Sequence, residues 1–98
     1  MVGLGGIWTE VLADVQLLPA DLQTDRIVAQ LRKLRASKLL TGYRGAEPVD
    51  LDAVAEVVAT VGRLMLSVPE IAEIDINPLV AYSKGKGVVA LDALIVTR

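Results

Sequence analysis

Several side-chain types are missing or scarce in this chain, and each absence narrows its possible structure or function. No cysteine occurs among its 98 residues, so the chain has no disulfide framework and no thiol chemistry, which is typical of a cytosolic protein. Histidine is absent too. The aromatic residues are only Trp8, Tyr43 and Tyr82, whereas 53% of the chain is hydrophobic. The core must therefore be aliphatic.

Charge and hydropathy exclude two further classes of protein. The formal net charge is −2, which leaves no basic footprint for nucleic acid. No apolar run approaches the roughly 20 residues that a membrane-spanning helix needs, and Met1–Gly3 does not resemble the start of a signal peptide. We therefore expect a cytoplasmic protein that binds neither nucleic acid nor membrane.

The sequence predicts one domain, residues 1–98, with elements in the order β-β-α-α-β-β. This is an α/β protein of the α+β type, in which a mostly antiparallel sheet packs against two helices. The first two strands are expected over Ile7–Leu12 and Val15–Leu18. A single core is feasible at this length, but the chain is small for a complete enzyme.

Two amphipathic helices are expected between the strands. The first has Asp21 or Thr24 as its N-cap and runs to about Ser37. It is expected because one of its faces is apolar. That face consists of Ile27, Val28, Leu31 and Leu34. The second helix runs from Leu51 to about Ser67, with Asp50 as its N-cap and Pro69 beyond its end.

The last two strands predict a β-hairpin with a cluster of oxygen ligands. Its turn is Ser83–Gly87, whose two glycines adopt positive φ at little cost. If Tyr82 pairs with Gly87, Asn77 falls directly opposite Asp92, and Asp75 lies on the same face. Two carboxylates and an amide oxygen suit Mg²⁺, which takes few protein ligands and completes its shell with phosphate and water. We therefore expect the cluster of Asp75, Asn77 and Asp92 to form a metal site.

A plain structural interpretation competes with this one. Asn-Pro commonly ends a strand, and isolated acids on a strand are usually part of its solvated face. A slip of the register by one residue would also turn Asp92 to the opposite face. Asp92 favours the functional interpretation, because its neighbours from Val88 to Val96 are all apolar. A charge inside such a run is costly unless it is paired or bound to a cation.

These hairpin residues, Glu73–Val80 and Leu91–Ala93, resemble the C-terminal end of an ATP-grasp domain. They are most similar to the type found in NDP-forming (ADP-forming) acyl-CoA synthetases and in the β subunit of succinyl-CoA synthetase. The resemblance continues in Gly3–Ile7 with Glu10–Leu12 and in Leu39–Gly45 with Pro48–Asp52. Four segments in the right order at the right spacing form a specific signal. It implies phosphoryl transfer between ATP or ADP and a phosphohistidine, coupled to making or breaking an acyl-CoA thioester.

The resemblance also implies roles for individual residues. Asn77 and Asp92 align with the family's metal-binding asparagine and aspartate. Asp75 stands where relatives of the succinyl-CoA synthetase type have a glutamate, and its implied role is catalytic, near the incoming phosphohistidine. The implied cofactors are Mg²⁺ and ATP or ADP, with CoA bound by other domains. Because this chain has no histidine, the phosphohistidine must lie elsewhere.

Two more residues are candidates for contact with the ligand. Arg44 lies in the glycine-bracketed loop Thr41–Pro48, and its planar guanidinium could bind a phosphoryl group or phosphohistidine through two hydrogen bonds. Glu10, on the first strand, could face the nucleotide cleft. An exposed loop arginine and an exposed strand acid are the competing interpretations. Gly3–Gly6 is not a dinucleotide-binding loop, because a strand is expected after it instead of a helix.

We therefore expect the C-terminal part of the ATP-grasp domain of an ADP-forming acid–CoA ligase, a fragment inactive on its own. Its partners would be the remaining ATP-grasp half and CoA-binding or CoA-ligase domains, in the same protein or in a partner subunit. Exposed apolar surface, expected along Ile7–Leu12, could also drive formation of a homo-oligomer. The alternative is a non-catalytic interaction or regulatory half-domain, for example in an acetyltransferase fusion. The acyl substrate is not encoded in these residues.

Overall fold

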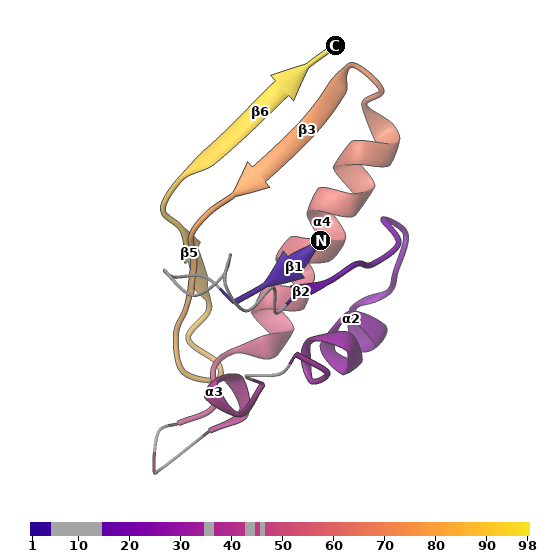
Figure 1. Ribbon diagram of the computed structural model, residues 1–98. Coiled ribbons are helices and arrows are strands. Elements are labelled where there is room, and N and C mark those ends of the chain that lie inside the picture. Colours follow the sequence, from indigo (N-terminus) through magenta and orange to yellow (C-terminus); the bar gives the residue numbers. More distant parts are fainter. Residues whose placement is uncertain (5–14, 35–36, 43–44, 46) are drawn as a thin grey trace.

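The computed structural model describes residues 1–4, 15–34, 37–42, 45 and 47–98. Helices and strands alternate in blocks in these residues, as Figure 1 shows. In chain order they are β1 (Val2–Gly3), β2 (Val15–Gln16), α2 (Thr24–Leu31), α3 (Lys38–Thr41), α4 (Leu51–Ser67), β3 (Ile71–Ile76), β4 (Leu79–Ala81), β5 (Val88–Ala90) and β6 (Ala93–Thr97). The pairs β1–β2, β3–β6 and β4–β5 are all antiparallel. The predicted α+β class with antiparallel strands is confirmed.

The last four strands form one long, bent hairpin. Ile76 lies opposite Ala93 in the pair β3–β6, and Leu79 lies opposite Ala90 in the pair β4–β5. The register therefore continues across the bend between the two pairs. A cis peptide bond joins Asn77 to Pro78 at this bend. The predicted turn closes the hairpin, because the Tyr82 amide donates to the Gly87 carbonyl at 3.0 Å.

The longest helix, α4, packs against α2 and forms the core with it. Among the described residues, the buried hydrophobic side chains are all aliphatic, as the sequence predicts: Ile27, Leu31, Leu34, Leu51, Ala55 and Ala59. Gly62 follows Ala55 and Ala59 on the same side of α4 and is buried as well. A methyl group on Gly62 would collide with the Ala20 carbonyl oxygen. The missing side chain is what allows the segment before α2 to cross α4 closely.

The first helix differs from its prediction at both ends. Its N-cap is Gln23, instead of Asp21 or Thr24, because Thr24 is already helical and Asp21 belongs to the turn in which the Leu22 amide donates to Pro19. The helix ends at Leu31 rather than Ser37, since tighter turns follow in which the Leu34 amide donates to Leu31. These turns still bury Leu34. The short helix α3 was not predicted.

The strand expected over Ile7–Leu12 lies outside the described residues, as does the apolar surface expected along it. The expected strand Val15–Leu18 is shorter in the structure and ends at Gln16. In the described part of the chain, no helix combines the length and the hydropathy needed to cross a membrane.

The Asp50 carboxylate connects α4 to the tip of the hairpin. One of its oxygens caps α4 as predicted, because the Ala53 amide donates to Oδ1 at 3.1 Å. The other oxygen, Oδ2, accepts a hydrogen bond from the Gly87 amide at 2.9 Å. The Asp50 amide in turn donates to the Tyr82 carbonyl at 2.8 Å. One side chain therefore fixes both the start of the helix and the turn of the hairpin.

The opposite end of the hairpin is tied to the other end of α4. The Arg98 guanidinium donates from Nε to the Pro69 carbonyl at 2.8 Å, and the Arg98 amide donates to the Glu70 carbonyl at 2.8 Å. The Ile71 amide donates to Val68, which directly follows α4, at 3.1 Å. The hairpin thus runs back along the helix and is attached near both helix ends (Figure 1).

We predict that replacing Gly62 with alanine destabilises the fold. By itself, alanine in a helix interior is more stable than glycine by about 1 kcal/mol. The collision with the Ala20 backbone should outweigh that gain and lower the free energy of unfolding by about 1–3 kcal/mol. Urea unfolding followed by circular dichroism measures the change. Glu56→Ala, at an exposed position of the same helix, should shift it by no more than about 0.5 kcal/mol. A Gly62→Ala variant more stable than the parent would show that Ala20 does not contact α4.

A second prediction concerns pH. Hydrogen bonds from the Gly87 and Ala53 amides hold the pKa of the Asp50 carboxyl below its ordinary value, because they favour the charged form. A carboxyl whose pKa is lower in the folded state than in the unfolded state stabilises the fold. This contribution is fully present above the unfolded-state pKa of about 3.9. That stability disappears as the pH falls through the folded pKa. Asp50→Asn should therefore be less stable than the parent chain at about pH 6, and the difference should shrink below about pH 4.

Unfolding curves at a series of pH values measure this difference. Glu56→Gln removes a carboxylate from an exposed position in the middle of α4 and serves as the matched control. Its difference from the parent should stay small at every pH. A constant Asp50→Asn difference from about pH 6 to pH 2 would contradict the proposed contribution of the charged carboxylate.

Candidate functional site

The predicted oxygen cluster lies at the bend of the hairpin, where β3 ends and β6 begins. The Asn77 amide donates to the Asp92 carbonyl at 3.1 Å, so the two residues stand directly opposite each other. Directly opposed residues of an antiparallel pair project their side chains from the same face. Asp75 precedes Asn77 by two positions and belongs to the same face. The register predicted from the turn is therefore the register that the structure has.

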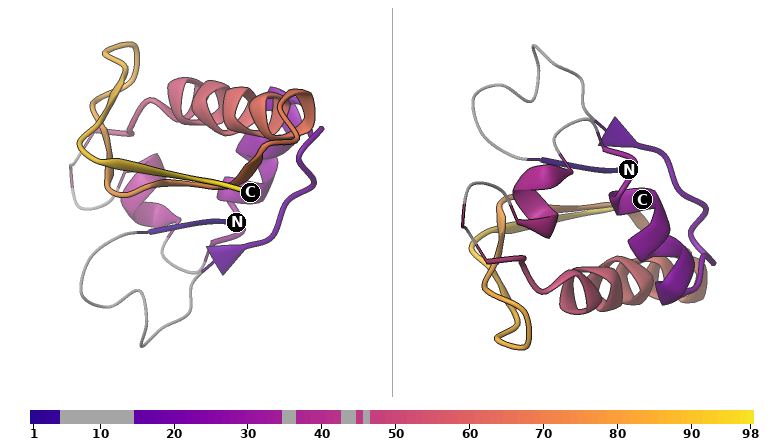
Figure 2. Two further views of the ribbon diagram at one scale, coloured as in Figure 1. Left: turned by 90° about the horizontal axis from the view of Figure 1, so that it is seen from above. Right: turned by 90° about the horizontal axis from the view of Figure 1, so that it is seen from below.

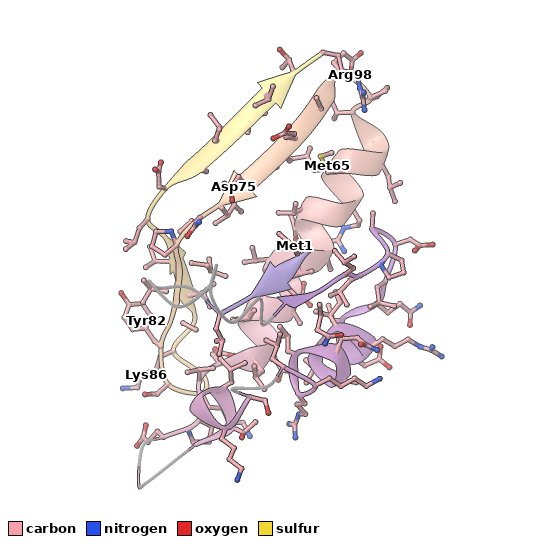
Figure 3. The ribbon with its side chains drawn as sticks, viewed as in Figure 1. Met1, Met65, Asp75, Tyr82, Lys86 and Arg98 are labelled. Carbon is pink, nitrogen blue, oxygen red and sulfur yellow. The ribbon has the colours of Figure 1, made fainter. Side chains whose placement is uncertain are left out.

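All three site side chains are accessible to solvent. Asp75, Asn77 and Asp92 are exposed, whereas Ile74 and Ile76, which alternate with them on β3, are half-buried. Figure 3 shows Asp75 on β3, with Met65 on the neighbouring helix α4. The hairpin thus has a partly covered apolar face toward α4 and an open polar face away from it.

Asp92 does not lie in the apolar surroundings that the sequence implied. It is exposed, and so are Leu91 and Leu94 on either side, with 64% and 59% of their surface accessible. One carboxylate oxygen, Oδ1, accepts a hydrogen bond from the next amide, Ala93, at 2.9 Å. The desolvation argument for a bound cation is therefore wrong for this chain. What remains is the position of Asp92 opposite Asn77.

The donor set fits an ion that takes few protein ligands. Among the described residues, no group of three or more histidine, cysteine, aspartate or glutamate side chains could hold a metal. Asn77 and Asp92 instead offer one amide and one carboxylate oxygen from opposed positions, with Asp75 nearby on the same face. Mg²⁺ is commonly held by one or two carboxylates together with the phosphates of a substrate and water. The arrangement suits Mg²⁺ brought by a nucleotide better than a closed structural metal site.

A hollow of about 1010 Å³ adjoins the site between β1, α4 and β3. Its floor consists mainly of valines of α4, and Asp75 and Asn77 are among its lining residues, together with Glu73. The sequence did not single out Glu73 as a functional residue, although it stands on the same face as Asp75 and Asn77. The hollow itself could not be predicted, because it depends on how β1 is placed over the helix.

The other two predicted site residues cannot be placed. Glu10 and Arg44 lie outside the described residues. Sequence reasoning also missed the second contact of Asp50, since Gly87 follows it by 37 positions and no local pattern connects them.

Comparison with known proteins gives consistent matches along the whole chain. The model of a family described as the ATP-grasp domain matches residues 1–97. The chain is 41% identical over 96 residues to the acetate–CoA ligase (ADP-forming) I subunit beta of Pyrococcus furiosus, a match that covers 98% of this chain and 40% of that protein. It is 39% identical over 98 residues to the 4-hydroxybutyrate–CoA ligase (ADP-forming) of Nitrosopumilus maritimus, covering 97% of this chain and 14% of that one.

A solved structure resembles the chain closely in three dimensions. It is the dinucleotide-forming acetyl-coenzyme A synthetase 1 of Ca. Korarchaeum cryptofilum, in complex with coenzyme A and Mg-AMPPCP. The TM-score is 0.89 at 41% sequence identity, and the match covers 98% of this chain and 44% of that chain. The chain therefore spans less than half the length of each of these relatives.

Proposed function

The chain belongs to the ATP-grasp domain family, and on that basis we propose that it forms the C-terminal part of this domain in an ADP-forming acyl-CoA synthetase. Its function there is to supply ligands for the Mg²⁺–nucleotide complex. The complete enzyme transfers a phosphoryl group between ATP or ADP and a phosphohistidine on another domain. The observation that carries this proposal is the opposed position of Asn77 and Asp92 on the open face of the hairpin.

The relatives support the reaction class. Both curated relatives described above are ADP-forming CoA ligases. The solved relative is in complex with coenzyme A and Mg-AMPPCP, and its phosphohistidine segment points towards its nucleotide binding site. A chain of this family without histidine fits the half of the reaction that holds the nucleotide.

The residues divide the work as follows. Asn77 and Asp92 hold Mg²⁺ by their side-chain oxygens, and the bound ion neutralises charge on the nucleotide phosphates. Asp75, on the same face, orients the incoming phosphohistidine. Arg44 contacts the transferred phosphoryl group, and Glu10 faces the nucleotide. Positioning and charge neutralisation are most of what a protein contributes to phosphoryl transfer.

Other parts of the enzyme must complete the site. The remaining ATP-grasp half would clasp the nucleotide from the other side, and CoA-binding and CoA-ligase domains would carry the thioester chemistry and the phosphohistidine. These parts would belong to the same polypeptide or to a partner subunit in the cytoplasm. A homo-oligomer is compatible with this arrangement.

We predict that the site substitutions reduce activity far more than folding. The test uses a chimera in which this chain takes the place of the matched 96 residues of the P. furiosus subunit, assayed with the rest of that ligase. Asn77→Ala and Asp92→Asn should each lower the turnover number by about 100-fold or more, the effect of removing one electrostatic group from a transition state. Thermal melting should change little, because both side chains are exposed.

Glu56→Gln, an exposed change on α4, is the control for the chimera and should leave the turnover number unchanged. Full activity in both site variants would refute the metal assignment. A folded chimera that lacks ligase activity with every site residue intact would favour the non-catalytic, regulatory half-domain instead.

The isolated chain should bind ATP or ADP weakly, because the other half of the clasp is missing. Calorimetric titration of the 98-residue chain with Mg-ADP should give no dissociation constant below about 1 mM, a binding free energy of about −4 kcal/mol. Micromolar affinity would show that these residues form a complete nucleotide site.

A further inference from the structure

The hydrogen bond between Asp50 and Gly87 connects the start of α4 with the strand pair that carries the candidate site. From Gly87 the pairing of the two strands continues without a break. The Gly87 carbonyl accepts the Tyr82 amide, and β4 pairs with β5 along its length. Beyond the bend, the Asn77 amide donates to the Asp92 carbonyl. Five positions separate each member of the first pair from its counterpart in the second. The opposed position of Asn77 and Asp92 therefore follows from the first pair.

The apolar pattern of β5 and the residue after it does not fix this register by itself. Every residue from Val88 to Leu91 is apolar, so a slip by one position would still bring an apolar side chain to each place. Packing in the interior does not hold this segment either, because Val89, Ala90 and Leu91 are exposed. The turn before it contains two glycines at positive φ, and glycine-rich segments specify a register only weakly.

Asp50 supplies the missing constraint. Its Oδ2 accepts the Gly87 amide at 2.9 Å, and its own amide donates to the Tyr82 carbonyl at 2.8 Å. A hydrogen bond to a carboxylate is roughly twice as strong as one between neutral groups. Asp50 is itself held by the Ala53 amide in the first turn of α4. In both views of Figure 2, the tip of the hairpin lies at the end of the molecule where α4 begins. A slip of the hairpin would break both bonds that Asp50 makes to its tip.

We propose that Asp50 is a positioning residue for phosphoryl transfer, because its bond to Gly87 keeps the hairpin in the register in which Asp92 faces Asn77. Without that bond a slipped register competes, and a slip by one position turns Asp92 to the opposite face. Molecules in the slipped register bind the Mg²⁺–nucleotide complex poorly, which lowers the apparent affinity of the whole population.

This inference rests on the proposed function, because Asp50 acts only through the residues proposed to hold Mg²⁺. Both of its carboxylate oxygens already accept backbone amides, so we assign it no contact with the ion. Its loss should therefore change how much Mg²⁺ the enzyme needs, and not the rate of the enzyme once the ion is bound.

The test measures turnover of the P. furiosus chimera against Mg²⁺ concentration, at a temperature at which circular dichroism shows every variant to be folded. Asparagine is as good an N-cap as aspartate but has one side-chain oxygen instead of two, so Asp50→Asn keeps the cap and loses Gly87. It should raise the Mg²⁺ concentration for half-maximal turnover by about 10-fold or more, as loss of a residue that orients a metal ligand does. Saturating Mg²⁺ should restore turnover to within about twofold of the unsubstituted chimera, because the bound ion selects the correct register.

Two more variants separate the bond to Gly87 from the other effects of Asp50. Asp50→Ser also keeps a capping oxygen and has no second one, so it should behave like Asp50→Asn. Asp52→Asn removes the same charge from the first turn of the same helix, at an exposed position. This control should change the half-maximal Mg²⁺ concentration by less than about twofold.

Two results would overturn the proposal. An Mg²⁺ dependence of Asp50→Asn equal to that of Asp52→Asn would show that the register holds without the carboxylate. A loss of turnover that saturating Mg²⁺ does not restore would show that Asp50 does not act through the binding of the ion. The variants Asn77→Ala and Asp92→Asn separate this inference from the proposed function. If both are impaired while Asp50→Asn keeps the Mg²⁺ dependence of the unsubstituted chimera, only the positioning role is refuted. If both are fully active, the metal assignment itself fails.

Discussion

The carboxylate of Asp50 is the contact on which the position of the candidate site depends. It accepts hydrogen bonds from the first turn of α4 and from the tip of the hairpin, at Ala53 and Gly87. At the far end, Arg98 is bonded to Pro69 and Glu70, just past the helix. A helix of 17 residues is a rod about 25 Å long. A hairpin attached near both ends of such a rod has little freedom at its middle, where Asn77 and Asp92 lie.

The helix α4 covers β3 but not the neighbouring strand β6, and this difference decides which strand surfaces remain exposed. Ile74 on β3 is half-buried against α4, whereas its partner Ile95 on β6 has 54% of its surface accessible. The strand β6 therefore extends beyond the cover that α4 provides. The exposed apolar side chains of this region are Val89, Leu91, Leu94, Ile95 and Val96. A strand edge of this composition is prone to pair with other chains unless another part of the protein covers it.

Much of this arrangement follows from local sequence rules. The pairing of Tyr82 with Gly87 came from the glycine turn, and Asp50 was recognisable as an N-cap before an apolar stripe. The end of the first helix was not recognisable. Leu34 faces the core whether the helix continues past Leu31 or the chain turns tightly there. The spacing of the apolar residues therefore does not show where the helix ends. No glycine or proline marks that position.

The exposure of Asp92 could not be predicted for a related reason. An apolar run reads the same in sequence whether the side chains are buried within one chain or exposed at a surface that another segment covers. The sequence therefore favours a buried run from Val88 to Val96, whereas the structure leaves most of this run exposed. The hollow between β1 and β3 is likewise a property of three elements at once, and no single stretch of sequence encodes it.

The helix cap and the candidate metal site are linked through the hairpin register. A slip of one residue would turn Asp92 away from Asn77, because side chains alternate along a strand. The register is fixed at Gly87, whose amide is bound by Asp50 and whose carbonyl accepts from Tyr82. Asp50 thus helps to set which side chains share the open face of the hairpin, where the nucleotide is proposed to bind. The residue that starts α4 and the residues proposed to hold Mg²⁺ form one structural unit, in which the cap positions the ligands without touching them.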